Sequence, residues 1–234
     1  MATLLIDTTY FLTVGILGRR PFCEESSTDH VEKIAPLAAR AMEEAGGKVE
    51  KIEVMAGPGP FTGLRAGLAF ATGLSLSLAV PLSAASLLFA EDVWARSEGA
   101  KIPVVAVNNA RRRQAYFQIF SEEGEDLSSM DIASPDKIAQ SALALGRPVA
   151  LAGLAGDYFD KISCAFSEAK VPFIPFLRPA GSARWLESMH ESAKERPLPP
   201  RPIYLRDADA VPLFAPQGEH PQEILAKNLL WSLN

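Results

Sequence analysis

The sequence predicts an α/β protein built from two lobes of similar plan. In each half of the chain, apolar and β-branched segments of strand length come first, and segments with helical periodicity follow them. In the first half, a loop rich in glycine and proline joins a strand to a helix. A proline-rich segment at residues 197–202 follows the last helical segment of the second half. We therefore expect one lobe at residues 1–103, a second at 104–206 and a tail at 207–234.

The first lobe is predicted to begin with strands. Residues 3–6 and 11–17 are apolar and β-branched, and the polar turn Asp7-Thr8-Thr9 lies between them. Residues 20–27 are compatible with a third strand. Asp29 and Glu32 then resemble a capping box, and apolar residues recur at helical spacing until a glycine pair ends the helix at 46–47.

A strand at 52–56 is predicted to lead into a glycine- and proline-rich loop at 57–63. In the following helix, small residues are spaced four apart, so that another part of the backbone can approach closely. No charge occurs between Arg65 and Glu91, a length that would permit a membrane span. Four serines and Pro81 favour instead a buried helix, a turn, a short strand and a second helix.

The second lobe is predicted to repeat this order. We expect strands at 104–107, 115–120 and 148–152 and helices at 135–145 and 182–194. The polar segment Asn108-Asn109-Ala110-Arg111 separates the first two strands. We assign no role to residues 210–234 of the tail. Its apolar residues predict one amphipathic helix packed on the body, formed by Ile224, Leu225, Leu229 and Leu230.

Composition excludes several classes of protein. The chain has 23 basic and 28 acidic residues, and its net charge of -5 argues against tight nucleic-acid binding by its own surface. Cys23 and Cys164 have no spacing for a metal or redox pair, so a reducing, cytoplasmic location is expected, with both residues acting as small apolar side chains. The first residues lack the basic region of a signal peptide.

Catalytic signatures fail on inspection. The segment Gly73-Leu74-Ser75-Leu76-Ser77 lacks the last glycine of a nucleophile elbow. His190-Glu191 begins like a zinc-protease helix, but Lys194 stands at the position of the second histidine. His30 is followed four residues later by Ile34, so no second imidazole shares its face of the helix. We therefore assign no catalytic residue and no metal ligand.

The glycine loop and a basic run each allow two interpretations. The loop lacks the lysine and spacing of a P-loop and the spacing of a dinucleotide fingerprint. It is either an anion cradle at a helix N-terminus or a turn that sets a strand against a closely packed helix. The adjacent Arg111, Arg112 and Arg113 are either a solvated strand edge or a contact for RNA.

Together these segments resemble the bacterial TsaB (YeaZ) family. The resemblance covers residues 3–206, and the loop with the Leu-Arg that follows it is the most specific segment. The matching segments are Ile6-Asp7-Thr8-Thr9, His30 with Pro36, Gly57-Pro58-Gly59-Pro60-Phe61-Thr62-Gly63-Leu64-Arg65, Ala110-Arg111 with Tyr116, and Pro202-Ile203-Tyr204-Leu205-Arg206.

The resemblance implies a two-lobed fold of the actin-like, Hsp70-like and sugar-kinase-like (ASKHA) ATPases, with duplicated βββαβα lobes. It also implies a function in making N6-threonylcarbamoyladenosine at position 37 of tRNAs that read codons starting with A. In that family TsaB is a non-catalytic, scaffold subunit that pairs with the catalytic paralogue TsaD, and the ATPase TsaE joins them. This chain would then contact tRNA only as part of the complex.

An ATPase of this fold needs acidic residues near the phosphates and Mg²⁺. Asp7 is present, but Asn109 replaces the family's usual Asp before Ala-Arg. Asp7, Thr8 and Thr9 are therefore interpreted as a degenerate phosphate motif. We expect this chain to bind no cofactor alone, with ATP or ADP held, if at all, at the junction with its partner.

The partner surface is expected on the two long helices at 29–45 and 62–78, because these helices pack against their TsaD counterparts in the family. A homodimer through the same patch is expected when TsaD is absent. Two alternatives remain: an active ATPase or small-molecule kinase of the same fold, and a peptidase. The residues assigned to the partner surface are His30, Ile34, Leu37, Leu64, Gly67, Leu68 and Ala71. The same stripes would also suit the core of a monomer, because their spacing does not determine which side faces outward.

Overall fold

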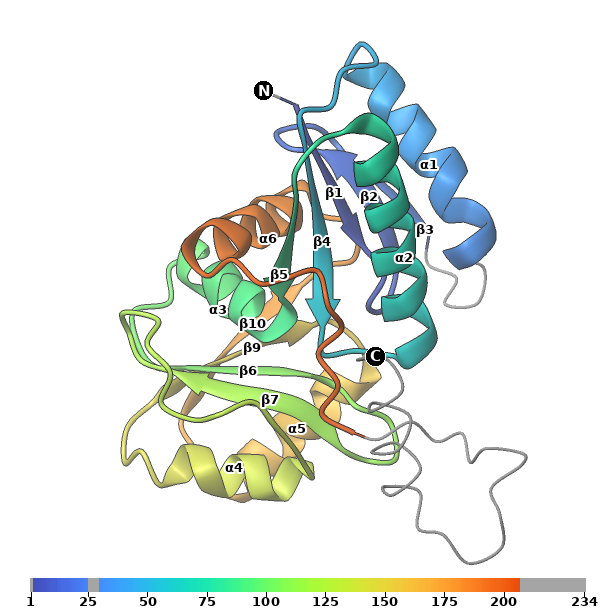
Figure 1. The fold of residues 1–234 in the computed structure, drawn as a ribbon. Coiled ribbons are helices and arrows are strands. Elements are labelled where there is room, and N and C mark those ends of the chain that lie inside the picture. Colours follow the sequence, from blue (N-terminus) through green and yellow to red (C-terminus); the bar gives the residue numbers. More distant parts are fainter. Residues whose placement is uncertain (1, 25–29, 207–234) are drawn as a thin grey trace, which may run out of the picture.

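The computed structural model describes residues 2–24 and 30–206, and the side chain of His30 lies outside that description. Its elements form two mixed sheets with helices around them (Figure 1). The first lobe contains β1 (Thr3–Asp7), β2 (Leu12–Ile16), β3 (Phe22–Glu24), α1 (His30–Glu44), β4 (Lys51–Gly57), α2 (Phe61–Leu78), β5 (Leu82–Ser86) and α3 (Leu87–Ser97). The second contains β6 (Val104–Asn109), β7 (Ala115–Phe120), β8 (Asp131–Ala133), α4 (Pro135–Leu143), β9 (Val149–Leu154), α5 (Asp157–Glu168), β10 (Phe173–Arg178) and α6 (Ala183–Glu195).

The two sheets have the same topology. The strand order is β3-β2-β1-β4-β5 in the first and, read from the other edge, β8-β7-β6-β9-β10 in the second. In both, the first strand pairs antiparallel with the second and parallel with the fourth. The predicted duplication is therefore confirmed, and each βββαβα unit is extended by one more strand and one more helix.

Each lobe has a core of its own. In the first, the buried strands pack against α1 and α2, and Leu4, Ile52 and Val54 are completely buried there. In the second, β6, β7 and β9 pack against α4 and α5 through side chains such as Leu151 and Phe166. Apolar strands buried on both faces explain why 3–6 and 104–107 could be identified from their composition.

The helices α3 and α6 lie between the lobes (Figure 1). Nine consecutive residues of α3, from 87 to 95, are buried. Trp185, Leu186 and Met189 of α6 pack against Leu5 and Met55 of the first sheet. The chain thus returns to the first lobe after β10. Beyond α6, Leu198 bridges to Ala84 and the Ile203 amide donates to the Ala56 carbonyl at 2.8 Å, before Arg206 reaches the second lobe at Ala110.

Most of the sequence-based elements are confirmed, and the differences have local causes. The charge-free stretch forms α2, β5 and α3 as predicted, and no helix among the described residues is long and apolar enough to cross a bilayer. The third strand begins at Phe22, two residues later than predicted, and residues 25–27 of the prediction lie outside the described part of the chain. The edge strand β10 was missed because Pro175 interrupts its pattern, and α5 was missed with it. The predicted capping residue Asp29 and the predicted tail helix lie outside the described residues.

Candidate functional site

Four chain segments meet where the two lobes join: the β1–β2 turn, the β4–α2 loop, the β6–β7 turn and the β9–α5 loop. Parallel strands β1 and β4 end there in the first lobe, as do β6 and β9 in the second. Asp7 ends β1 and Asn109 ends β6, and each pairs with the first residues of the following antiparallel strand. In open α/β sheets, ligands bind beyond the carboxyl ends of the strands, so this junction is the candidate site.

Both oxygens of the Asp7 carboxylate accept hydrogen bonds from the chain's own donors. Its Oδ1 atom accepts hydrogen bonds from the backbone amide of Thr9 at 2.9 Å and from the Thr9 hydroxyl at 2.6 Å. Its Oδ2 atom accepts one from Trp185 Nε1 at 2.7 Å. The side chain is buried, with 4% of the residue exposed. Asp7 therefore acts as a structural acceptor that joins the turn to α6.

Thr8 and Thr9 are covered by the glycine loop and the start of α2. The Thr8 hydroxyl donates to the Gly63 carbonyl at 2.8 Å. A Cβ atom on Gly67 would overlap the Thr8 hydroxyl and lie 3.0 Å from its Cγ2, and one on Gly59 would lie 3.2 Å from Thr9 Cγ2. The glycines are needed because α2 approaches the turn so closely. These contacts favour the structural interpretation of the loop over the anion cradle.

A buried ion pair crosses from α3 to β10 beside this turn. Arg178 donates through Nε and Nη2 to Glu91 Oε1, both at 2.9 Å, and Asn108 Nδ2 donates to the same oxygen at 2.9 Å. The Arg178 guanidinium also stacks 3.6 Å from the Trp185 ring. Because Trp185 holds Asp7, a continuous set of contacts joins the β1–β2 turn, α3, α6 and both sheets.

A pocket of about 400 Å³ remains on the second-lobe side of these contacts. Tyr10, Asn109, Gly156, Asp157 and Lys161 contribute to its walls. The Tyr10 hydroxyl donates to the Asn109 carbonyl at 2.7 Å. Burial, with smaller contributions from Tyr116 and Glu91, raises the pKa of Tyr10 well above its ordinary value, so it stays a neutral hydrogen-bond donor.

In an ATPase of this fold, acidic groups near the phosphates hold Mg²⁺. Here the carboxylate at the end of β1 already accepts three hydrogen bonds, and the end of β6 carries an amide. Among the residues that the structure describes, no group of three or more His, Cys, Asp or Glu side chains is placed to hold a metal. His190 contacts the buried carboxylate of Glu53, with 2.9 Å between Nδ1 and Oε2, and Glu53 also pairs with Lys51.

The predicted partner residues lie on the inward faces of α1 and α2. Ile34, Leu37, Leu64, Leu68 and Ala71 are buried in the core of the first lobe. Gly67 is buried against Thr8. His30 begins α1, and its side chain lies outside the described part of the chain. The helical spacing was recognised correctly, but it marks the core, so the surface available to a partner is formed by other residues of the same helices.

That outward surface is an apolar groove of about 440 Å³ between α1 and α2. Its walls carry one charged side chain, Glu43, among the residues that the structure describes. The other lining residues are Ala35, Ala38, Ala39, Met42, Gly47, Phe70 and Leu74.

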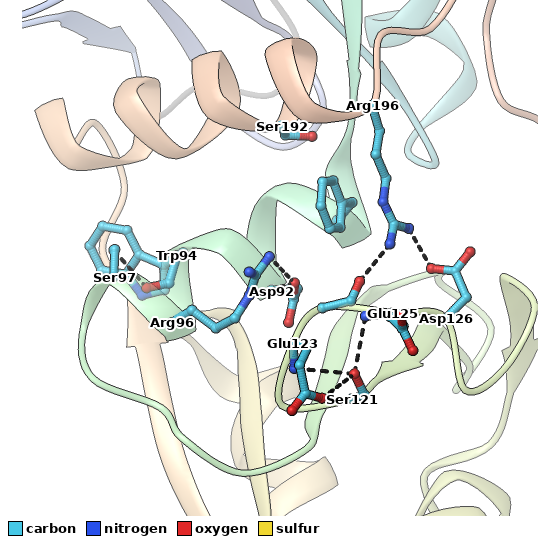
Figure 2. Close-up of polar contacts among 12 residues, drawn as sticks. Asp92, Trp94, Arg96, Ser97, Ser121, Glu123, Glu125, Asp126, Ser192 and Arg196 are labelled. Atoms are coloured by element: carbon cyan, nitrogen blue, oxygen red, sulfur yellow. Dashed lines mark hydrogen bonds and ion pairs between the residues drawn. The ribbon is translucent and has the colours of Figure 1, made fainter.

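A second polar network ties α3 and α6 to the β7–β8 loop (Figure 2). Arg96 donates to Asp92 Oδ2 at 2.9 Å from Nε and 2.6 Å from Nη2. Arg196 contacts the Phe89 ring at 4.0 Å, donates to the Gly124 carbonyl and pairs with Asp126. Burial raises the pKa of Asp92 to about 6, against the lowering effect of Arg96. Its Oδ1 atom has no hydrogen-bond partner among the described residues.

Sequence reasoning missed Glu91, Arg178, Trp185 and Arg196. The one local signal was a tryptophan in a helix that is otherwise rich in charge, since such a ring packs inward and its N–H needs an acceptor. Nothing local pairs Glu91 with Arg178, which is 87 residues away.

Comparison with known proteins gives one family and several relatives. The family model described as TsaD, tRNA N6-adenosine threonylcarbamoyltransferase, matches residues 21–178, more than half of the chain. An uncharacterized protein of Mycobacterium tuberculosis is 29% identical over 223 residues, which cover 90% of this chain and 94% of that protein.

Two relatives carry informative names. The tRNA threonylcarbamoyladenosine biosynthesis protein TsaB of Buchnera aphidicola is 28% identical over 148 residues, covering 59% of this chain and 66% of that protein. The solved structure of YeaZ from Pseudomonas aeruginosa superposes with a TM-score of 0.66 at 26% identity. The superposition covers 87% of this chain and 99% of that one.

Proposed function

Because this chain belongs to the family of TsaD, the tRNA N6-adenosine threonylcarbamoyltransferase, and within it to the TsaB (YeaZ) group, we propose that it is a non-catalytic subunit. Its role in the biosynthesis of threonylcarbamoyladenosine in tRNA follows from these relatives. The finer proposal is that it binds and activates the catalytic paralogue TsaD in the cytoplasm. The complex modifies position 37 of tRNAs that read codons starting with A.

The observation that supports the non-catalytic role is that both oxygens of the Asp7 carboxylate already accept hydrogen bonds from the chain. A phosphate- or Mg²⁺-binding aspartate must present free oxygens to the ligand. Here three hydrogen bonds from Thr9 and Trp185 use both oxygens. The ion pair of Arg178 with Glu91 fills the space behind that turn. The degenerate phosphate motif of Asp7, Thr8 and Thr9 thus supports the lobe junction instead of a substrate.

The apolar lining of the groove between α1 and α2 suits a partner that binds through a helix. Small side chains such as Ala35 and Ala39 let a second helix approach closely, and Phe70 and Leu74 supply apolar area. A paralogue with the same fold carries two equivalent helices, which makes a four-helix contact feasible. The same groove would be covered by a second copy of this chain when TsaD is absent.

The remaining partners follow from the same assignment. The ATPase TsaE would join the pair of subunits, and tRNA would be met by the assembled complex. ATP or ADP would sit at the junction with the partner. Beside this pocket, Asn109 stands where the family usually has an aspartate, and Asp157 is the acidic residue in the pocket wall. The amide at position 109 disfavours the alternative of an independent ATPase or small-molecule kinase.

The test is co-expression with the TsaD of the same organism, followed by gel filtration and by nucleoside mass spectrometry of the tRNA. We expect co-elution at micromolar concentration and formation of threonylcarbamoyladenosine only when both proteins are present. Ala39→Arg places a charge in the groove at an exposed position and should abolish co-elution. Ser141→Arg, on the exposed face of α4, is the matched control. Separate elution of the two wild-type proteins would refute the pairing.

A further inference from the structure

The β6–β7 turn presents three consecutive arginines in a left-handed backbone conformation. The φ angles of Arg111, Arg112 and Arg113 are 63°, 50° and 60°. Each non-glycine residue in this region is strained by roughly 1–2 kcal/mol relative to right-handed conformations. Strain of this kind persists only where the surrounding structure holds it, and it is concentrated at functional sites.

The base of this turn is held firmly from three sides. Asn109 Oδ1 accepts from the Arg111 amide at 2.7 Å, and the Ala110 amide donates to the Gln114 carbonyl at 2.9 Å. Arg206, which arrives from the other end of the chain, donates to the Ala110 carbonyl at 3.2 Å and to the Gln114 side chain. The three arginine side chains above this base are exposed.

Two of the three arginines in this turn have no ionic partner in the described part of the chain. The guanidinium groups of Arg111 and Arg113 make no hydrogen bond or ion pair with any residue that the structure describes. Beside the turn lies a pocket of about 220 Å³ whose walls include Arg111, Arg112 and Arg206 but no Asp or Glu among the described residues. A chain with a net charge of -5 thus concentrates positive charge at one place.

Aromatic rings adjoin these arginines. The rings of Phe61 and Tyr204 stack with centroids 4.9 Å apart, and the Arg65 guanidinium lies 3.8 Å from the Phe61 centroid. Arg65 Nε also donates to the Tyr204 hydroxyl at 3.0 Å. Phe61, Tyr116 and Tyr204 line the pocket together with the arginines, and 41% of Tyr204 is exposed. Figure 1 shows the segment that ends at residue 206 reaching the β6–β7 turn.

We propose that the arginine turn and the neighbouring pocket form a binding site for the phosphodiester backbone of RNA, and that this chain thereby contributes directly to holding tRNA. The inference rests on the proposed function, which supplies tRNA as the RNA. Guanidinium groups bind phosphate in a bidentate manner, and exposed aromatic rings provide stacking surfaces for unpaired bases. A cluster of arginines next to such rings can bind both the phosphate and the base of a nucleotide.

An acidic protein segment is the competing ligand, and two observations disfavour it. The pocket has room for a phosphate with its ribose but not for an acidic helix, which would need an extended groove. Stacked rings at the rim have no role in recognising a carboxylate, but they suit a base. A net charge of -5 gives the chain little general attraction for RNA, so phosphate contacts should be few and the salt slope correspondingly small.

The experiment measures binding of a fluorescein-labelled, unmodified tRNA transcript by fluorescence anisotropy between about 50 and 200 mM KCl. It is carried out with the complex of this chain and TsaD and, separately, with this chain alone. Arg111→Ala/Arg113→Ala removes two exposed charges. Lys101→Ala/Arg147→Ala removes two charges that precede β6 and β9, at the opposite end of the same sheet, and serves as the control.

For the double arginine variant we expect Kd to rise roughly five- to twentyfold at about 100 mM salt, and the salt slope to fall by about 1–2. The control should stay within about twofold of the wild type. Arg111→Lys/Arg113→Lys should recover most of the affinity. Equal losses in the variant and the control, or no loss in the variant, would overturn the proposal.

Two readouts separate this inference from the proposed function. If the wild-type proteins elute apart or make no modified nucleoside, the proposed function fails, and the titration of the isolated chain still decides on the RNA site. If the complex assembles and modifies tRNA while the double variant binds tRNA like the wild type, only the RNA site is refuted. If the double arginine variant binds tRNA normally but no longer binds TsaE, the patch is a protein-binding surface and the RNA site is refuted as well.

Discussion

The β1–β2 turn of the first lobe and the β6–β7 turn of the second have the same place in two sheets of the same topology, but they have opposite environments. The first is buried, and Asp7 is satisfied by Thr9 and Trp185. The second is exposed, basic and left-handed over three residues. Duplication of the lobe has therefore allowed one copy of the turn to become part of the core. The other copy is exposed to solvent.

The ion pair behind the first turn should show the largest effect on stability. Arg178→Met leaves the carboxylate of Glu91 buried without its cation, and we expect the free energy of unfolding to fall by about 3–5 kcal/mol. Arg178→Met/Glu91→Gln removes the charge as well and should recover most of that loss. Urea unfolding measures both. If the double variant is no more stable than Arg178→Met, the pair is not what joins the lobes.

Asp92 on α3 differs from Asp7, because one of its carboxylate oxygens has no hydrogen-bond partner among the described residues. Burial raises the pKa of Asp92 to about 6 in the folded protein, above its ordinary value of 3.8. The folded state then binds a proton more tightly than the unfolded state, so this group stabilises the fold below pH 4 and loses that contribution as the pH rises through 6.

We therefore expect the stability of the wild type relative to Asp92→Asn to fall by up to about 3 kcal/mol between pH 4 and pH 7. Denaturant unfolding of both proteins at several pH values checks this. Asp126→Asn is a suitable control, because its carboxyl group is exposed and pairs at the surface with Arg196. A stability difference that does not change with pH would show that Asp92 titrates normally.

The closeness of α2 to the first turn can be tested with two glycines of one helix. A methyl group on Gly67 would overlap Thr8, whereas a methyl group on Gly73 would meet nothing within 4 Å. Gly67→Ala should therefore destabilise the protein by about 1–3 kcal/mol. Gly73→Ala should stabilise it by roughly 0.5–1 kcal/mol through helix propensity. Thermal unfolding distinguishes them, and equal effects would contradict the tight packing.

Local patterns predicted those parts of the molecule that local chemistry determines. The apolar strands and the spacing of α1 and α2 were predicted because each depends on neighbouring residues, whereas the sequence alone allowed the glycine loop to be either a packing turn or an anion cradle. The direction in which the helical faces point was not predicted. Ile34 and Leu68 have the same spacing whether they meet the sheet or a partner, and only the arrangement of the elements decides between the two.

The lobe junction was unpredictable for a different reason. Trp185 meets Asp7 across 178 residues of sequence, and Arg178 meets Glu91 across 87. No periodicity or motif links residues so far apart. The sequence predicts that Asp7 belongs to a degenerate phosphate motif, but it does not reveal the tryptophan that donates to this carboxylate from a helix that folds back onto the first lobe.

The smallest expected effect concerns the second turn and separates its backbone strain from its charge. Arg113 has a φ of 60°, which glycine adopts without strain, so Arg113→Gly should stabilise the fold by roughly 0.5–1 kcal/mol. Arg113→Ala removes the same guanidinium but keeps the strained conformation, and it should not stabilise. Both variants should weaken tRNA binding equally, since both lose one phosphate contact. If Arg113→Gly is both more stable and as tight a binder as the wild type, the left-handed turn is not maintained for the ligand.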